Sequence, residues 1–134
     1  MKNISGSGKR KRAIARATLK AVTGIIRINS VPLELVQPKM SMLKLQETLL
    51  LIGEIANKID INVIVNGGGY SSRVEAARTA IANALVLWTK NDKLRNMYVD
   101  YDRTLLISDA RRTEPHKPSR STAGPRRTKQ QSKR

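Results

Sequence analysis

The apolar positions in the first part of the chain recur at every second residue. Four small or apolar side chains share one face of this alternation: Ala13, Ala15, Ala17 and Leu19. A period of two is typical of a β-strand that buries one face. We therefore predict a strand from Lys9 to Ala21, preceded by a flexible leader over residues 1–8.

Two shorter apolar segments follow this strand. Thr23-Gly24 interrupts the alternation, and the run at 25–28 resumes it. Because glycine permits the backbone conformations of tight turns, these positions predict a β-hairpin with Gly24 in its turn. A third short strand is predicted over 31–36, at a sheet edge because Pro32 has no amide hydrogen to donate to a neighbour.

The middle of the chain changes to helical spacing and then back to a strand. Apolar residues recur three and four positions apart, namely Met42, Leu45, Leu49 and Ile52. This spacing predicts an amphipathic helix from Pro38 to about Gly53. The β-branched run at 59–65 predicts a buried strand, with every second residue facing the core.

An alanine-rich helix follows the glycines Gly67-Gly68-Gly69. Ser72 and Glu75 have capping-box spacing, which predicts that the helix begins at Ser72. A short helix and turn are expected over 92–102, with Leu94, Met97 and Tyr98 reaching back to the core. Together these elements predict an α/β (α+β) domain in which a small sheet packs against two main helices.

Positive charge is concentrated at the two ends of the chain. The 134 residues include 26 Lys and Arg against 10 Asp and Glu, a formal net charge of +16. Residues 1–20 and 109–134 each carry a net charge of +7, whereas residues 21–108 carry +2. A near-neutral middle can fold on itself, but two basic ends attract a polyanion, and nucleic acid is the leading candidate.

The last apolar anchor is the run Leu105-Leu106-Ile107, so the predicted globular domain covers residues 1–108. Residues 109–134 contain two alanines as their only hydrophobic residues apart from prolines. Such a segment cannot bury enough apolar surface to offset its chain entropy. We therefore predict an extended basic tail over 109–134.

Several function classes lack the residues they require. The chain has no cysteine and one histidine, His116, which lies in the tail without a partner to orient it. Gly6-Ser7-Gly8-Lys9 lacks the other residues of a phosphate-binding P-loop. The apolar runs are too short to span a membrane or form a signal peptide. We expect a cytoplasmic protein that is not an enzyme, has no metal or other cofactor, and takes no small-molecule substrate.

The candidate chemistry is phosphate binding. Lys9 to Arg12 is a run of four cations, and Arg16 and Lys20 continue it along one strand face. Three glycines between a strand and a helix N-terminus allow close approach of a phosphate backbone, although a turn alone would explain one or two of them. Aromatic residues make up only 3% of the chain, which favours reading phosphates, grooves and shape over base stacking.

The predicted RNA-binding residues lie in the basic run, the glycine turn and the tail. They are Lys9, Arg10, Lys11, Arg12, Arg16, Lys20, Gly67, Gly68, Gly69, Ser71, Arg73, Arg111, Arg112, Lys117, Arg120, Arg126, Arg127 and Lys129.

The order of these segments resembles that of one family. The segments are 8–17 at the start, Ile28-Asn29, Val65 to Gly69 before the alanine-rich helix, Asp109 to Arg112, and the terminal Gln131-Ser132-Lys133-Arg134. The chain is identified as a member of the small-subunit ribosomal protein nine family, archaeal type. The stretch 114–122 differs from the pattern of bacterial members, so the path of the mid-tail stays open.

The resemblance implies a left-handed β-α-β fold of the type found in the second domain of ribosomal protein five. It also implies binding to the small-subunit ribosomal RNA of the head, beside neighbouring ribosomal proteins. The tail residues that would contact transfer RNA in the peptidyl site are Gln131, Ser132, Lys133 and Arg134. Two other hypotheses are a free RNA chaperone or architectural nucleic-acid binder, and the protein subunit of a transfer-RNA-processing RNA enzyme.

Overall fold

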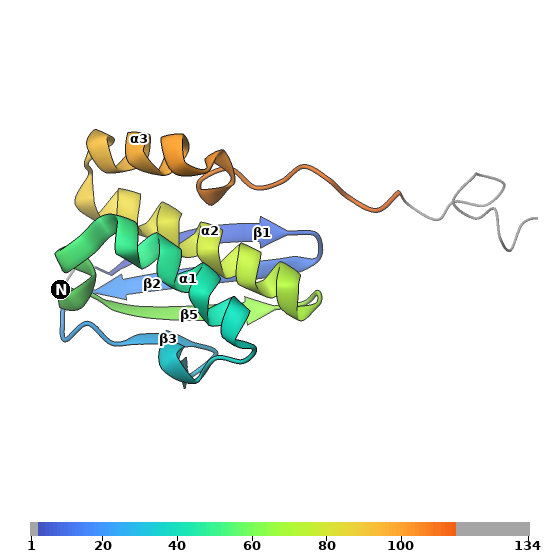
Figure 1. The fold of residues 1–134 in the computed structure, drawn as a ribbon, viewed down its shortest axis with the longest axis horizontal. Helices are drawn as coiled ribbons and strands as arrows, with labels where there is room; N and C mark the ends of the chain where they lie inside the picture. Colours follow the sequence, from blue (N-terminus) through green and yellow to red (C-terminus); the bar gives the residue numbers. More distant parts are fainter. Residues whose placement is uncertain (1–2, 115–134) are drawn as a thin grey trace, which may run out of the picture.

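Residues 3–114 are described by the computed structural model, and they form one β-sheet with three α-helices (Figure 1). The strands are β1 (Ile4–Arg10), β2 (Ala13–Lys20), β3 (Ile26–Ile28), β4 (Val31–Pro32) and β5 (Asp60–Asn66). The helices are α1 (Lys39–Ile52), α2 (Tyr70–Thr89) and α3 (Asp92–Tyr101). Short 3-10 turns over 33–35, 53–58 and 103–105 connect them.

The sheet is mixed, with the strand order β1-β2-β5-β3-β4. All neighbouring pairs are antiparallel except β3 and β5, which run parallel and are joined through α1. In Figure 1, β5 points to the right and lies above β3, and the helices lie in front of the sheet. The crossover from β3 through α1 to β5 is therefore left-handed, and the predicted α+β fold is confirmed.

The helix-facing side of the sheet forms the core. The alternating residues of β2, Ala13 to Leu19, are fully buried, and so are Ile61 and Val63 of β5. They pack beneath α2, whose own alanines Ala76, Ala80 and Ala84 are fully buried too. Small side chains on both surfaces let helix and sheet approach closely, so the alanine-rich composition determines the spacing of the two layers.

The expectation of a flexible leader over residues 1–8 is wrong for residues 4–8. They belong to β1, which pairs antiparallel with β2 along its whole length. A Cβ at Gly6 would lie 2.5 Å from the Ala84 amide nitrogen, so strand and helix backbones are nearly in contact there. Glycine-rich sequence is typical of flexible segments, but these glycines allow a strand to pack directly against α2.

The predicted hairpin around Gly24 is also wrong. Because β5 pairs with both β2 and β3, it lies between them, and residues 21–25 cross the end of β5 instead of turning back. Asp60 holds this crossing, since its Oδ1 accepts hydrogen bonds from the amides of Thr23 and Ile25, each at 2.9 Å. These two hydrogen bonds lower the pKa of the Asp60 carboxyl, and the bond from Ile25 has the larger effect.

Four local predictions need correction. The long strand 9–21 is interrupted by a two-residue turn at Lys11 and Arg12, where Lys11 has a φ of +51°. The strand predicted over 31–36 is limited to β4, followed by a 3-10 turn. Helix α2 begins at Tyr70, so Ser72 lies inside its first turn and does not cap it. Met97 is 45% exposed, whereas Leu94 and Tyr98 reach the core as predicted.

Candidate nucleic-acid interface

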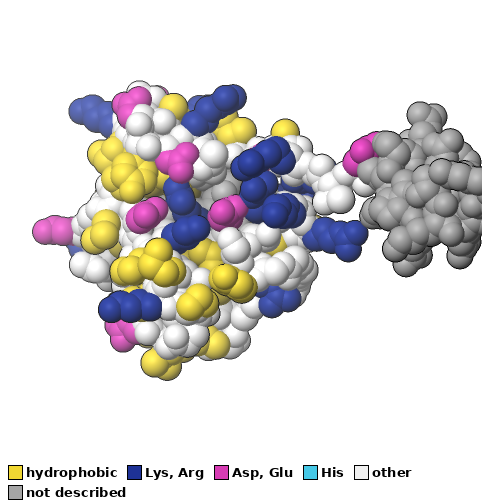
Figure 2. Space-filling model, turned by 45° about the vertical axis from the view of Figure 1, so that its right-hand side comes forward, with side chains coloured by type: hydrophobic (Ala, Val, Ile, Leu, Met, Phe, Trp, Pro, Cys, Tyr) yellow, Lys and Arg dark blue, Asp and Glu magenta, His cyan; other side chains and the backbone are white. Residues whose placement is uncertain are grey.

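Three segments that are distant in sequence meet at one end of the molecule. The β1–β2 turn, the glycine turn between β5 and α2, and the start of the tail all lie at the right of Figure 1. We call this region the basic end and define it as Lys11, Arg12, Gly67–Gly69, Arg73, Arg111 and Arg112. Its five cationic side chains are exposed to solvent. Figure 2 shows Lys and Arg side chains gathered on the side from which the tail leaves.

The three glycines of the turn between β5 and α2 differ in their surroundings: two pack against the β1–β2 turn, and one is open to solvent. Gly67 and Gly68 have φ values of +78° and +66°, which side-chain-bearing residues rarely adopt. A Cβ on Gly67 would also lie 2.7 Å from the Arg12 carbonyl oxygen, so these two glycines let the two turns touch. Gly69 has a φ of −84° and open space where its Cβ would be. Of these three glycines, Gly69 is therefore the one whose backbone conformation and described neighbours would also accept a side chain.

Helix α2 presents its N-terminus to solvent beside this turn. Gly69 is its N-cap residue, and no side chain caps the helix. Arg73 stands one turn into the helix, where its Nε donates to the Gly67 carbonyl at 3.0 Å. Uncapped amides and an exposed guanidinium favour an anion at this position. Ser71, also predicted to bind RNA, is exposed on the same first turn.

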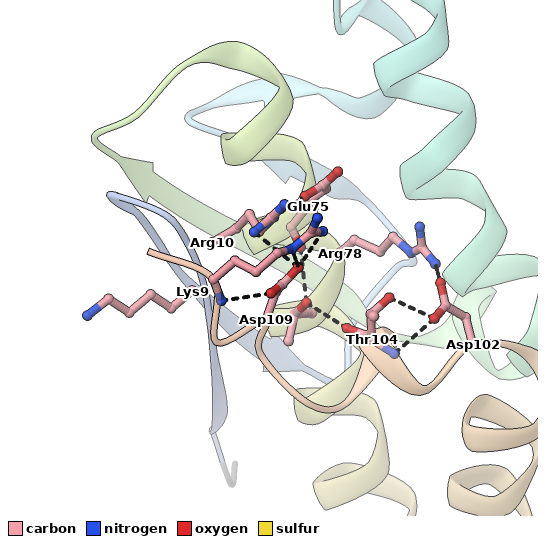
Figure 3. A pocket seen from close by; sticks show the side chains of 9 residues that line it. Lys9, Arg10, Glu75, Arg78, Asp102, Thr104 and Asp109 are labelled. Atoms are coloured by element: carbon pink, nitrogen blue, oxygen red, sulfur yellow. Dashed lines mark hydrogen bonds and ion pairs between the residues drawn. The ribbon is translucent and has the colours of Figure 1, made fainter. Parts of the chain in front are cut away.

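Arg10 differs from its neighbours because it binds within the protein. Its side chain is only 14% exposed, and its Nε lies 2.6 Å from Oε2 of Glu75 on α2 (Figure 3). Its Nη1 lies 3.1 Å from Oδ2 of Asp109. The two-residue turn explains this orientation: Arg10 pairs with Ala13, and both face the helices. Arg10 thus fastens β1 to α2 and to the start of the tail.

Asp109 connects this ion pair to the tail. Its Oδ2 also accepts from Nε of Arg111 at 2.9 Å, and its Oδ1 accepts from the Arg111 amide at 2.9 Å. Those hydrogen bonds from Arg111, with the added charge of Arg10, lower the pKa of Asp109 to about 2. Arg112 donates to the Asp109 carbonyl at 3.0 Å. The first tail residues are therefore held against the body, with Arg111 and Arg112 still exposed.

A second charged cluster ties the helices together behind this point. Arg78 of α2 lies 2.7 Å from the Asp102 carboxylate and 3.6 Å from that of Glu47 on α1. Burial raises the pKa of Asp102, but hydrogen bonds from Thr104 and Arg78 outweigh it, and the net shift is downward. Arg78, Asp102 and Thr104 also line a cavity of about 190 Å³, which Arg10 and Asp109 line from the other side (Figure 3).

The remaining predicted residues of the folded part lie on the outer face of the sheet. Lys9, Arg16 and Lys20 all point away from the helices and are exposed. The predicted shared face of Arg16 and Lys20 is present, and β3 adds the exposed Arg27 to it. This arginine is absent from the predicted RNA-binding residues. The sequence pattern also gave no sign that Glu75 and Asp109 pair with Arg10, because those ion pairs depend on tertiary contacts.

Nine of the eleven tail positions predicted to bind ribosomal or transfer RNA lie outside the described residues. They are Lys117, Arg120, Arg126, Arg127, Lys129, Gln131, Ser132, Lys133 and Arg134. Within residues 3–114, no group of three or more His, Cys, Asp or Glu residues could hold a metal ion. No helix of that part is long and apolar enough to span a bilayer.

The fold and the exposed cations define a class: a small α+β protein with a left-handed β-α-β unit, suited to binding a polyanion. The family model described as ribosomal protein S9/S16 matches residues 8–134, and the chain belongs to this family. It is 53% identical over 132 residues to small ribosomal subunit protein uS9 of Methanococcus vannielii. It is 52% identical to uS9 of Methanococcus maripaludis strain C7, and each alignment covers 98% of both chains. The archaeal-type resemblance is confirmed.

Proposed function

We propose that this protein is a non-catalytic constituent of the small ribosomal subunit, which binds small-subunit ribosomal RNA through the basic end and the tail. The observation that carries the proposal is the meeting of three separate segments, which brings five exposed cations and an uncapped helix N-terminus together. Charge-assisted hydrogen bonds from arginine forks suit phosphate oxygens. The names of its relatives support the same role.

Salt dependence tests the phosphate contacts. We expect binding to ribosomal RNA from purified small subunits to weaken steeply with salt, because each neutralised phosphate releases counterions. A plot of the logarithm of the binding constant against the logarithm of the salt concentration gives a slope that counts the phosphate contacts. Changing Lys11→Glu and Arg12→Glu together should lower the magnitude of this slope by about 1.4 to 1.8, or 0.7 to 0.9 for each contact. The matched control is Lys58→Glu with Lys93→Glu, both exposed residues away from the basic end. Equal losses in both double variants would contradict a localised interface.

The tail carries the second part of the proposal. Ser132, Lys133 and Arg134, with Gln131 just ahead, contact the anticodon stem-loop of transfer RNA in the peptidyl site. Deleting 132–134 should weaken transfer-RNA binding to small subunits while leaving the thermal unfolding of the protein unchanged, because those residues contribute no apolar side chain to a core. Unchanged transfer-RNA binding would refute this part and leave the ribosomal role standing.

Sedimentation separates the ribosomal role from its two rivals. In a magnesium-containing sucrose gradient, the protein should migrate with small subunits and whole ribosomes in fixed proportion. A free chaperone or a processing-enzyme subunit would instead be recovered mainly in the light fractions at low salt. Membership of a ribosomal protein family favours the first outcome.

A further inference from the structure

The outer face of the sheet is not covered by any described element. The helices all lie on the opposite side, and two isoleucines remain half exposed on the outer face, Ile14 at 55% and Ile64 at 54%. They are close neighbours across β2 and β5, because Ile14 pairs with Asn66 and Arg16 pairs with Ile64. We call this surface the open face; its central residues are Ile14, Arg16, Ile64 and Asn66.

The charges around the open face select an anionic partner. Lys9, Arg16, Lys20 and Arg27 are exposed on it, and Arg12 stands at its edge. The one carboxylate among its described strand residues belongs to Asp60, which already accepts hydrogen bonds from Thr23 and Ile25. A polyanion therefore fits this surface, and a basic or neutral protein partner does not match its charge.

Phosphate contacts alone do not account for the centre of this face. Arg12, Ile14, Arg16, Ile64, Asn66 and Gly67 line an open groove there, with a volume of about 480 Å³. Isoleucine gains nothing from a phosphate, whereas the flat surface of a nucleobase would bury its apolar area. Asn66 is exposed, and no hydrogen bond of its side chain occurs among the described residues. A side-chain amide offers both a donor and an acceptor to a base edge.

We propose that the open face binds one unpaired nucleotide of RNA in this groove. The base lies on Ile14 and Ile64, Asn66 pairs with the edge of the base, and Arg16 and Arg12 hold the flanking phosphates. A base inside a duplex cannot present its face to a sheet, so the nucleotide belongs to a loop, bulge or strand end. This inference rests on the proposed RNA-binding function and adds base recognition to it.

The two kinds of contact respond differently to salt, and this difference is the test. The full-length protein is titrated with ribosomal RNA from small subunits at several salt concentrations. Ile64→Thr, which keeps a β-branched residue in β5, and Asn66→Ala should each weaken binding about three- to tenfold without changing the salt slope. Arg16→Gln should lower that slope by about 0.7 to 0.9. The matched controls, Val99→Ala and Asn96→Ala on α3, should change neither quantity.

Chemical probing then identifies the nucleotide. A reagent that modifies the pairing edges of bases should show one protected unpaired position with the wild-type protein. That protection should be lost with Asn66→Ala, while protection of the neighbouring backbone persists. Thermal unfolding of every variant shows that it is folded before its binding is interpreted.

The outcomes distinguish this proposal from the one on which it rests. If Lys11→Glu with Arg12→Glu does not change RNA binding, the proposed function fails. If that variant weakens binding but Ile64→Thr and Asn66→Ala match wild type, only the nucleotide site is overturned. If these open-face variants bind RNA normally but are not incorporated into small subunits, the face instead docks another protein, which also overturns the proposal.

Discussion

The contact between β1 and α2 makes Gly8 the most sensitive position in the first strand. A methyl group on Gly8 would lie 2.5 Å from the Ala80 amide nitrogen and would meet the Ala76 carbonyl oxygen. Both atoms belong to the backbone of a 20-residue helix, so neither can rotate out of the way. The substitution Gly8→Ala therefore forces β1 and α2 apart.

The expected cost follows from this geometry. Overpacking a close contact costs about 1 to 3 kcal/mol, and two fixed backbone atoms place Gly8→Ala near 3 kcal/mol. A domain of this size has a total stability of about 5 to 15 kcal/mol, so the loss is a large fraction of it. Since 1 kcal/mol shifts the midpoint of such a domain by about 3 to 5 °C, Tm should fall by about 10 °C.

Thermal unfolding of the full-length protein, followed by circular dichroism, measures this effect. Gly69→Ala is the matched control: its φ is −84°, and no heavy atom lies within 4 Å of the position of the added methyl group. The one loss expected for this control arises because alanine is a poorer N-cap than glycine. It should lower the free energy of unfolding by less than about 1 kcal/mol.

A Tm for Gly8→Ala equal to that of the Gly69→Ala control would refute the reasoning. It would mean that residues 4–8 do not pack on α2, and the flexible leader expected from sequence would be correct after all. A large loss would show that the strand is an integral part of the folded domain.

Three further predictions concern single polar groups. Asn29→Ala removes two hydrogen bonds, 2.8 and 3.2 Å long, to the backbone of Val65, and places alanine at a φ of +48°, so about 2 kcal/mol should be lost in denaturant unfolding. Tyr98→Phe removes the buried bond to the Thr48 carbonyl and should cost about 1 kcal/mol in the same assay, with an unchanged denaturant slope. Because the pKa of Asp109 is lowered on folding to about 2, its stabilising contribution is fully present above its ordinary pKa and is lost as pH falls through about 2. Asp109→Asn should therefore flatten the dependence of the free energy of unfolding on pH between about 4 and 2, measured by denaturant unfolding at each pH. A variant that loses stability with falling pH as steeply as wild type would contradict the ion pair.

Local patterns were sufficient for the elements that bury one regular face. The alternation of Ala13 to Leu19 and the run at 59–65 became β2 and β5 with the predicted faces inward, and α1 ends at Ile52 with Gly53 as its C-cap. In each case the period of apolar residues matches the geometry of the element, and packing of the layers buries that same apolar face.

Strand order could not be obtained in this way. The turn residues at Gly24 suggested a hairpin, but β5 is the strand with the most β-branched residues and lies between β2 and β3. The order of the strands depends on the free energy gained when both edges of β5 pair with other strands. Those partners are distant in sequence, so a local turn signal carries no information about them.

For the candidate site, the sequence by itself determined the amount of charge and the segments that carry it, because these are properties of composition. Only the tertiary structure decided which cations face outward. The turn at Lys11 and Arg12 directs Arg10 inward to Glu75 and Asp109 and leaves Arg16 on the open face. The physical reason is that side-chain direction in a strand reverses with each residue, so one turn changes which partner every later charge can meet.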